Sequence, residues 1–257
     1  MENNKLTGEK KIVQVKTALI GSEKPVFIAG PCSIESKEHI YNEAKKLKEL
    51  GVDILRGGAF KPRTSPYDFQ GLGFEGIKYF REAADEVGLP LVTEVLSEYD
   101  IEKMIDDVDM FQVGSRNMYN YSMLKELGKV NKPVLLKRGF SATIKEWSMA
   151  AEYIAQGGND NIVFCERGIR AFNDYTRNTL DLAGAVLIKQ MTGRPVIVDP
   201  SHATGIRELI EPMTDASIAC GLDGVMIEVH QCPDEAISDG KQTINYETYE
   251  KIRRKYR

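Results

Sequence analysis

Short apolar runs alternate with longer amphipathic segments along most of the chain. Between residues 37 and 50, Ile40, Ala44, Leu47 and Leu50 recur at helical spacing, and Gly51 follows as a helix stop. Eight apolar runs of strand length are separated by segments of this kind, at residues 25–29, 52–55, 90–93, 110–113, 134–136, 162–165, 196–198 and 224–227. This alternation is typical of a parallel sheet joined by crossover helices.

The pattern predicts one α/β domain, a closed (β/α)₈ TIM barrel, because eight repeats follow one another without a linker. An open doubly wound sheet is the alternative. After the helix at residues 37–50, further helices are expected at residues 75–87, 99–106, 122–130, 144–156, 178–192, 216–221 and 246–257. Residues 12–15 predict a short strand or half of a hairpin that closes one end of the barrel. Residues 1–24 would be a short N-terminal extension and residues 25–257 the barrel.

Composition and charge exclude several classes of protein. The 257 residues are 42% apolar and 28% charged with a net charge of −4, so nothing favours binding to nucleic acid or an anionic membrane. No apolar run approaches the roughly 20 residues of a membrane span. The first residues lack the pattern of a secretion signal, and the four cysteines form no CxxC pair. We expect a cytoplasmic protein with free thiols.

Polar or ionisable groups follow every predicted strand. In a barrel these groups gather at the carboxyl-terminal end, where active sites are built. They are, in chain order, Cys32, Arg56, Glu94, Ser115 with Arg116, Lys137 with Arg138, Glu166 with Arg167, Asp199 with His202, and Glu228. The sequence therefore predicts one shared concave site.

The segment after the second predicted strand is suited to phosphate. Pro62 and Pro66 bracket Arg63, Thr64 and Ser65 and hold this tripeptide extended. A guanidinium offers a planar fork to phosphate oxygens, and the two hydroxyls add neutral donors. A solvated basic loop is the simpler interpretation, but such a loop would not need this stiffening.

A metal site is a second hypothesis from the residues. One thiolate, one imidazole and two carboxylates, from Cys32, His202, Glu228 and Asp239, suit a divalent transition metal. No pair of them has a diagnostic ligand spacing, and His202 alone would be a hydrogen-bonded loop histidine. His230 is expected to have a structural or supporting role, and His39 to lie on the surface.

Several motifs resemble those of one enzyme family. Lys61-Pro62-Arg63-Thr64-Ser65 followed by Phe69-Gln70-Gly71-Leu72-Gly73 is similar to the signature of 3-deoxy-7-phosphoheptulonate synthases, and the resemblance covers about residues 24–245. These enzymes condense phosphoenolpyruvate with erythrose 4-phosphate at the start of aromatic amino-acid biosynthesis, the shikimate pathway. The segments around Cys32, His202, Glu228 and Asp239 match, in order, those that supply the family's metal ligands. The resemblance implies one divalent ion, Mn²⁺ first, with Fe²⁺, Co²⁺, Zn²⁺ or Cd²⁺ as alternatives.

The resemblance also implies roles for the remaining site residues. The residues expected to bind phosphoenolpyruvate are Arg56, Lys61, Arg116, Lys137 and Arg167, together with the backbone of Gly114 and Ser115. Pro62, Arg63, Thr64 and Ser65 would bind the sugar phosphate. The catalytic residues expected are Lys137, Glu94, Lys61 and His202. Either Glu94 or Lys137 would activate the water that attacks phosphoenolpyruvate.

Three alternatives stay open at this level. The related 3-deoxy-8-phosphooctulonate synthases use arabinose 5-phosphate, but they have Ala-Asn where this chain has Lys61-Pro62. Lys137 could form a Schiff base, with Arg138 favouring its neutral amine. A non-catalytic barrel that binds sugar phosphates would leave the metal ligands without a role. Within any of these, Lys137 or Arg167 could simply pair with Glu94 or Glu166.

The chain resembles the compact type I-beta microbial form of the family. Only about 24 residues precede the first predicted barrel strand, too few for a regulatory domain, so we expect no feedback inhibition by phenylalanine or tyrosine through one. The expected partners are the two substrates, further copies of the chain in a homotetramer or homodimer, and a separately encoded chorismate mutase.

Overall fold

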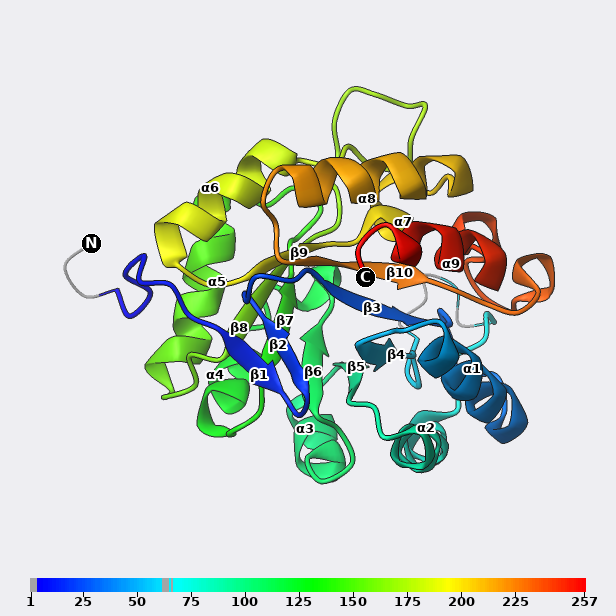
Figure 1. The fold of residues 1–257 in the computed structure, drawn as a ribbon. Coiled ribbons are helices and arrows are strands. Elements are labelled where there is room, and N and C mark those ends of the chain that lie inside the picture. The colour runs from blue at the N-terminus through cyan, green and yellow to red at the C-terminus, as the bar shows by residue number, and fades with distance from the viewer. Residues whose placement is uncertain (1–3, 62–64, 66) are drawn as a thin grey trace.

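The computed structural model describes residues 4–61, 65 and 67–257, in which eight parallel strands close into a barrel (Figure 1). The strand order is β10-β3-β4-β5-β6-β7-β8-β9, so that β9 pairs with β10 to complete the circle. The barrel strands are β3 (Val26–Gly30), β4 (Ile54–Arg56), β5 (Leu91–Val95), β6 (Met110–Val113), β7 (Val134–Lys137), β8 (Ile162–Glu166), β9 (Val196–Val198) and β10 (Gly224–Glu228). This confirms the predicted α/β barrel and excludes the open sheet.

Helices surround the barrel on its outer face (Figure 1). They are α1 (Lys37–Glu49), α2 (Gly73–Val87), α3 (Glu98–Met104), α4 (Tyr121–Lys129), α5 (Ile144–Gln156), α6 (Leu182–Thr192), α7 (Pro200–Thr204), α8 (Ile210–Ala219) and α9 (Tyr246–Arg254). Four short 3₁₀ turns complete the described elements: η1 (Ser115–Asn117), η2 (Arg207–Leu209), η3 (Pro233–Glu235) and η4 (Gly240–Gln242).

Three helices differ from the sequence-based expectation by more than a shift of one to three residues at an end. α6 begins at Leu182 rather than residue 178, because the Asp181 side chain caps it by accepting from the Gly184 N–H. α8 begins at Ile210 rather than residue 216, with Pro212 in its first turn, where a missing N–H costs nothing. The short α7 was not predicted; Asp199 caps it and Pro200 occupies its first position.

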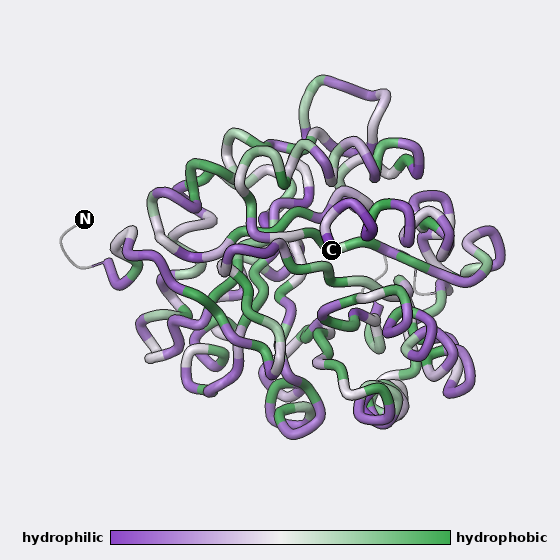
Figure 2. The backbone as a smooth tube through the Cα atoms, viewed as in Figure 1, coloured by the Kyte–Doolittle hydropathy of each residue, from purple (hydrophilic) through white to green (hydrophobic). Residues whose placement is uncertain are grey.

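A small hairpin closes the amino-terminal end of the barrel. β1 (Val13–Val15) and β2 (Ala18–Ile20) pair antiparallel and alternate buried with exposed residues. Their inward side chains join the cluster that fills the barrel interior, whereas a second cluster lies between the strands and the surrounding helices. Most residues of the barrel strands are correspondingly apolar (Figure 2). The predicted hairpin is therefore present.

Within the described part of the chain, no helix has both the length and the apolar character that crossing a membrane requires. The loop between β8 and α6 stands out from the rim of the barrel (Figure 1).

Candidate active site

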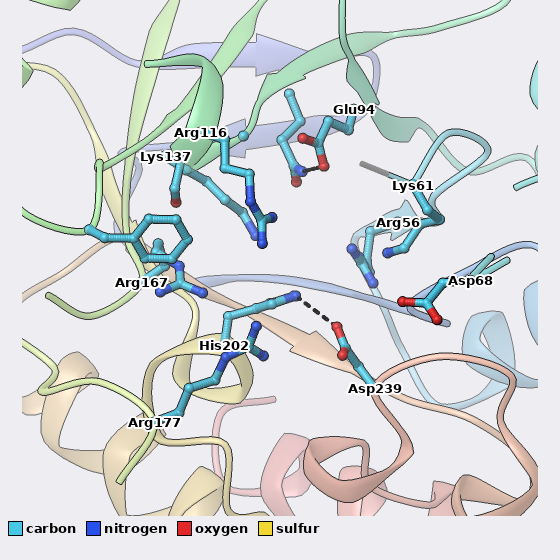
Figure 3. Close-up of a pocket in the computed structure, with 14 residues that line it drawn as sticks. Arg56, Lys61, Asp68, Glu94, Arg116, Lys137, Arg167, Arg177, His202 and Asp239 are labelled. Carbon is cyan, nitrogen blue, oxygen red and sulfur yellow. Dashed lines mark hydrogen bonds and ion pairs between the residues drawn. The ribbon is translucent and has the colours of Figure 1, made fainter. Parts of the chain in front are cut away.

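One cavity opens at the carboxyl-terminal ends of the strands, where the sequence predicted a shared site (Figure 3). Fourteen residues line it: Arg56, Lys61, Asp68, Glu94, Gln112, Gly114, Ser115, Arg116, Lys137, Phe140, Arg167, Arg177, His202 and Asp239. Cys32 and Glu228 are buried and are not among the lining residues. Ser65 is half-buried and is also not among them, while Pro62, Arg63 and Thr64 are outside the described residues.

The four predicted metal ligands converge from four separate segments. The Cys32 Sγ lies 3.4 Å from the Asp239 Oδ2, and donor atoms of Cys32, Glu228 and Asp239 all lie within 4.8 Å of one another. The His202 Nε2 lies 3.3 Å from the Glu228 Oε1 and 3.9 Å from the Asp239 Oδ2. Ligands about 2.0–2.3 Å from one ion lie roughly 3.3–3.8 Å apart in a tetrahedral arrangement. These donor atoms therefore fit a single divalent ion.

Asp199 fixes the orientation of His202. Its Oδ1 accepts from the His202 backbone N–H at 2.9 Å as the cap of α7, and its Oδ2 lies 2.7 Å from the His202 Nδ1. A proton on Nδ1 therefore points to Asp199, which leaves the Nε2 lone pair facing Glu228 and Asp239. Burial lowers the pKa of His202, despite the two neighbouring carboxylates. A neutral imidazole with Nε2 free is the form that binds a metal.

Glu228 is held on both of its oxygens at the end of β10. The Arg56 Nη1 donates to Oε1 at 2.9 Å, and the Gln242 Nε2 donates to Oε2 at 2.7 Å. Burial alone would raise the pKa of Glu228, but His202, Arg56 and Lys61 lower it to about 2. The carboxylate is therefore charged at neutral pH and aimed by two donors.

Cys32 lies beneath the cavity beside Lys61. The Lys61 Nζ lies 2.9 Å from the Cys32 Sγ and donates to the Cys32 carbonyl at 3.0 Å. Burial, together with the Glu228 charge, raises the pKa of the Cys32 thiol to about 12, although Lys61 opposes this. A buried thiol between two carboxylates would ionise readily only with a cation bound beside it.

One wall of the cavity carries cations grouped around an aromatic ring. The Arg167 and Arg116 guanidinium carbons lie 4.6 and 5.6 Å from the centre of the Phe140 ring. Within the described residues neither guanidinium forms a salt bridge, and the buried Arg167 Nη1 has no hydrogen-bond partner. Burial lowers the pKa of Arg167. A bound anion would give the buried Arg167 charge the partner that it needs, and the exposed Arg116 guanidinium lies near enough to contact the same anion.

Glu94 and Lys137, the two candidates for activating water, have different surroundings. The Lys137 Nζ donates to the Asp199 Oδ2 at 2.6 Å, so this lysine already has a carboxylate partner. The Gln112 Nε2 donates to the Glu94 Oε2 at 3.3 Å. A Cβ added to Gly114 would come within 2.0 Å of the Glu94 Oε1, so the absence of a side chain at 114 leaves room for this carboxylate.

The alternative pairings considered for Lys137 and Arg167 are absent from the described residues. Lys137 pairs with Asp199 rather than with Glu94 or Glu166. It is Arg138 that binds Glu166, at 2.9 Å, and it also binds Asp181, at 2.8 Å. Because two carboxylates engage Arg138, its charge is compensated and it offers little help to a Schiff base at Lys137.

Sequence reasoning assigned no site role to six residues that the structure places in or beside the cavity: Asp68, Gln112, Phe140, Arg177, Asp199 and Gln242. The sequence could have indicated Gln112, because it is a polar residue inside an otherwise apolar predicted strand. Asp199 was noted at its strand end, but its contact with His202 requires the cap of α7, which was not predicted.

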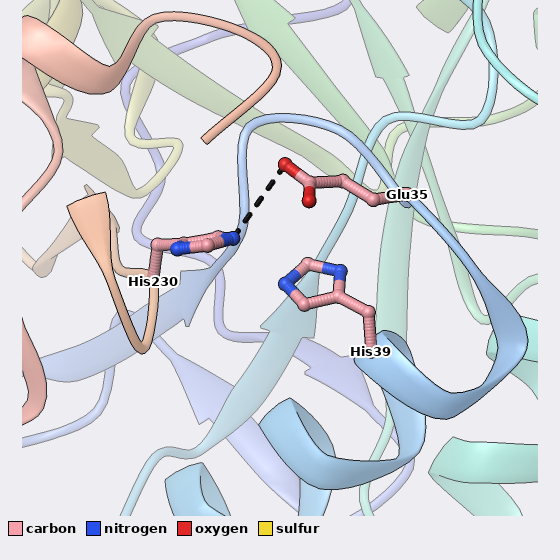
Figure 4. A group of neighbouring side chains, drawn as sticks. All are labelled: Glu35, His39 and His230. Carbon is pink, nitrogen blue, oxygen red and sulfur yellow. Dashed lines mark ion pairs between the residues drawn. The ribbon is translucent and has the colours of Figure 1, made fainter. Parts of the chain in front are cut away.

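A second group of donors is formed by Glu35 from the loop between β3 and α1, His39 from α1 and His230 from the segment after β10 (Figure 4). The Cys232 backbone N–H donates to the His230 Nδ1 at 3.0 Å, so in the neutral ring the proton is on Nε2, which faces Glu35 at 3.5 Å. This tautomer disfavours metal binding through Nε2. The Glu35 Oε1 also accepts from the Ile237 N–H, two residues before Asp239. The supporting role expected for His230 fits this geometry, whereas His39 is largely buried rather than on the surface.

Comparisons with known proteins agree with the motifs. The DAHP synthetase I family matches residues 7–257. The phospho-2-dehydro-3-deoxyheptonate aldolase of Thermotoga maritima is 48% identical over 95% of this chain and 72% of its own. The crystal structure of the Thermotoga maritima phospho-2-dehydro-3-deoxyheptonate aldolase (DAHP synthase) superposes with a TM-score of 0.95 at 46% identity, over 98% of this chain and 76% of that one. A 2-dehydro-3-deoxyphosphooctonate aldolase of Thioalkalivibrio sulfidiphilus is 31% identical, over 86% of this chain and 84% of its own. The chain therefore belongs to the DAHP synthetase I family.

Proposed function

We propose that the cavity condenses phosphoenolpyruvate with erythrose 4-phosphate to 3-deoxy-D-arabino-heptulosonate 7-phosphate and phosphate, with one divalent metal held by Cys32, His202, Glu228 and Asp239. The observation that carries this proposal is the convergence of these four donors beside guanidinium groups that form no salt bridge among the described residues. The 48% identity to the Thermotoga enzyme supports the heptulosonate reaction over the octulosonate one.

Mn²⁺ is the metal that we propose first, with Fe²⁺, Co²⁺, Zn²⁺ and Cd²⁺ as ions that the same donors accept. When bound, the ion supplies Lewis acidity to the aldehyde of the sugar phosphate. The protein contributes the orientation of the donors. Asp199 directs the His202 ring, and Arg56 with Gln242 directs the Glu228 carboxylate.

Phosphoenolpyruvate would bind against Arg116, Arg167 and Lys137, with Lys61 and Arg56 completing the positive wall of the cavity. The backbone at Gly114 and Ser115 would add donors. Both guanidiniums beside Phe140 lack a salt-bridge partner among the described residues, so a trianionic substrate would remove their mutual repulsion. Pro62, Arg63, Thr64 and Ser65 would hold the phosphate of the sugar.

In the reaction, carbon 3 of phosphoenolpyruvate forms a bond to the aldehyde carbon and water adds to carbon 2. The bond from carbon 2 to the phosphate oxygen then breaks and releases phosphate. We assign the base that takes the proton of water to Glu94, because Lys137 is paired with the Asp199 carboxylate whereas Glu94 lines the cavity with only an amide donor, Gln112, on it. The Lys137 ammonium would then balance charge and donate a proton as phosphate leaves, while His202 would act as a metal ligand and Lys61 would hold the Cys32 thiolate next to the metal.

The test is to remove metal with a chelator and to follow the absorbance of phosphoenolpyruvate in the presence of erythrose 4-phosphate. We expect no consumption without metal and full consumption after Mn²⁺ is added. Turnover that persists in the stripped protein would contradict the metal mechanism and would favour a Schiff base at Lys137. Faster turnover with arabinose 5-phosphate would favour the octulonate synthase, and no turnover with either sugar would favour a binding protein.

We further propose that the protein acts in the cytoplasm as a homotetramer or homodimer, with a separate chorismate mutase as a partner. An apolar outer face on α6 supports self-association, because Leu187 and Met191 are about half exposed there.

A further inference from the structure

Arg177 is a cation of the cavity that the sequence analysis did not assign. It lies in the loop between β8 and α6 and lines the same cavity as Arg116 and Arg167 (Figure 3). Among the described residues it forms no ion pair with a carboxylate, and its Nη1 donates to the neutral Gln242 Oε1 at 2.8 Å. It is also close enough to Arg167 to help lower the pKa of that guanidinium.

The loop holds Arg177 in place by contacts with α7, the helix that carries His202. The Arg177 N–H donates to the Thr204 carbonyl at 2.9 Å, and the Asn178 N–H donates to the Ala203 carbonyl at 2.8 Å. A Cβ added to Gly205 would come within 2.9 Å of the Arg177 Cβ, so the start of the arginine side chain packs against this glycine. Arg177 is therefore aimed at the cavity by the backbone, although its side chain is accessible to solvent.

Gln242 connects Arg177 to a metal ligand. Its Oε1 accepts from the Arg177 Nη1 and its Nε2 donates to the Glu228 Oε2 at 2.7 Å. Chemistry fixes this orientation, because the guanidinium has no acceptor and the carboxylate has no proton to donate. Gln242 is 4% exposed, so water cannot easily replace either contact. A glutamate at 242 would place a second carboxylate against Glu228.

We propose that Arg177 binds an anionic group of a substrate, a phosphate or carboxylate, and that Gln242 transmits its position to Glu228. Arg177 is then a binding residue, and Gln242 is a positioning residue for the metal ligand. The chain of contacts runs from the accessible guanidinium to a carboxylate that is fully buried. This inference rests on the proposed function, since it takes Glu228 as a ligand and the cavity as the substrate site.

The experiment compares Arg177→Met and Gln242→Met with Arg170→Met. Arg170 is the matched control, because it lies on the same loop and contacts the same Phe140 ring but is exposed and does not line the cavity. Mn²⁺ affinity is measured on the metal-stripped protein without substrates, by the electron paramagnetic resonance signal of free Mn²⁺. The KM of each substrate and kcat are measured at saturating metal.

We expect Arg177→Met to raise the KM of one substrate about tenfold, with kcat changed less than threefold. A higher KM for phosphoenolpyruvate would mean that Arg177 binds this substrate together with Arg167. A higher KM for erythrose 4-phosphate would mean that Arg177 binds the phosphate of the sugar. We expect Gln242→Met to weaken Mn²⁺ binding about tenfold. We expect Arg170→Met to change neither the KM values nor the Mn²⁺ affinity.

Two results would overturn the proposal: Arg177→Met matching Arg170→Met in both KM values, or Gln242→Met binding Mn²⁺ as tightly as the unaltered protein. A lower melting temperature with unchanged KM and metal affinity would reduce both residues to a structural role. Should Arg177→Met fail to fold, Arg177→Lys decides, because the charge is kept but the planar fork is lost and the KM must still rise. Metal-dependent turnover of the unaltered protein tests the proposed function separately.

Discussion

At the scale of single residues, the cations of the site fall into those that form an ion pair with a carboxylate and those that do not. Arg56 is paired with Glu228 and Lys137 with Asp199, at 2.9 and 2.6 Å. Arg116 and Arg167 contact the Phe140 ring and form no salt bridge among the described residues. The two paired cations therefore also orient a carboxylate each, whereas Arg116 and Arg167 have no such second task among the described residues.

Gly114→Ala tests whether the Glu94 carboxylate needs its present position. The backbone at Gly114 is extended and tolerates alanine, but the added Cβ would lie 2.0 Å from the Glu94 Oε1. We expect kcat/KM to fall about a hundredfold, since a displacement of about 1 Å can cost that much, and overpacking to destabilise the fold by about 1–3 kcal/mol. Steady-state kinetics and chemical denaturation check both.

Gly139→Ala is the control for this substitution, because its Cβ would meet nothing closer than 3.3 Å near the same cavity. Equal activity of the two variants would show that Glu94 can move without loss, and it would remove the argument for Glu94 as the base.

The residues of the site were more predictable than their contacts. The strand-end rule identified the positions of Arg56, Lys137 and Glu228, because it needs only the repeat and the polar residue after each run. It could not predict that Lys137 faces Asp199, since that pairing depends on side-chain directions from β7 and β9, two strands that β8 separates. Arg177 was missed for a similar reason, because it lies in a loop several residues beyond its strand.

At the scale of elements, Arg138 joins the ends of β7, β8 and α6. It is 4% exposed and binds Glu166, which is fully buried, as well as Asp181, which caps α6. Burial raises the pKa of Glu166, and Arg138 partly offsets that effect. The arginine thus compensates a buried charge at a junction of three elements.

Arg138→Met should lower the free energy of unfolding by about 3 kcal/mol at pH 7.5, because Glu166 loses its charge partner. A carboxyl whose folded pKa is raised destabilises the fold as pH rises, since the unfolded chain releases that proton more easily. Removing Arg138 raises the folded pKa of Glu166 further. The difference in the free energy of unfolding between Arg138→Met and the unaltered protein should therefore be smaller at pH 5. Urea denaturation at both pH values measures it.

Lys129→Met is the comparison, because Lys129 forms an exposed pair with Glu126 and should cost less than about 1 kcal/mol at either pH. A deficit for Arg138→Met that is the same at pH 5 and pH 7.5 would mean that lost packing, and not the Glu166 charge, explains the effect.

Element boundaries show where local patterns end. The helix at residues 144–156 was predicted to its bounds, and the structure shows a capping box of Thr143 and Glu146 at its start. The start of α8 was missed because Pro212 interrupts the helical pattern, and α7 was missed because five residues are too few to show a period. Long amphipathic helices can thus be predicted from the sequence, whereas short connecting helices cannot.

At the scale of the whole molecule, the two ends of the barrel have separate tasks. The β1–β2 hairpin fills the amino-terminal end with Val13, Val15 and Ile20, and the cavity lies at the carboxyl-terminal end. The interior side chains between them are apolar and close-packed. A change at the hairpin should therefore alter stability and leave the chemistry intact.

Ile20→Ala should lower the free energy of unfolding by about 2–4 kcal/mol, because its fully buried side chain leaves a cavity. At 25 °C its KM values and kcat should match those of the unaltered protein. Leu19→Ala, on the outer face of the same strand and 44% exposed, should change stability by less than about 1 kcal/mol. A large loss of kcat in folded Ile20→Ala would show that the two ends are coupled.

The position of Asp199 has a consequence for how this site can evolve. One oxygen of this carboxylate contacts both the Lys137 Nζ and the His202 Nδ1. A substitution of Lys137 during evolution would therefore also disturb the His202 ring, and a substitution of His202 would disturb Lys137. The three positions are therefore coupled through one oxygen atom, and a designer who changes any of them in this barrel should change all three as one unit.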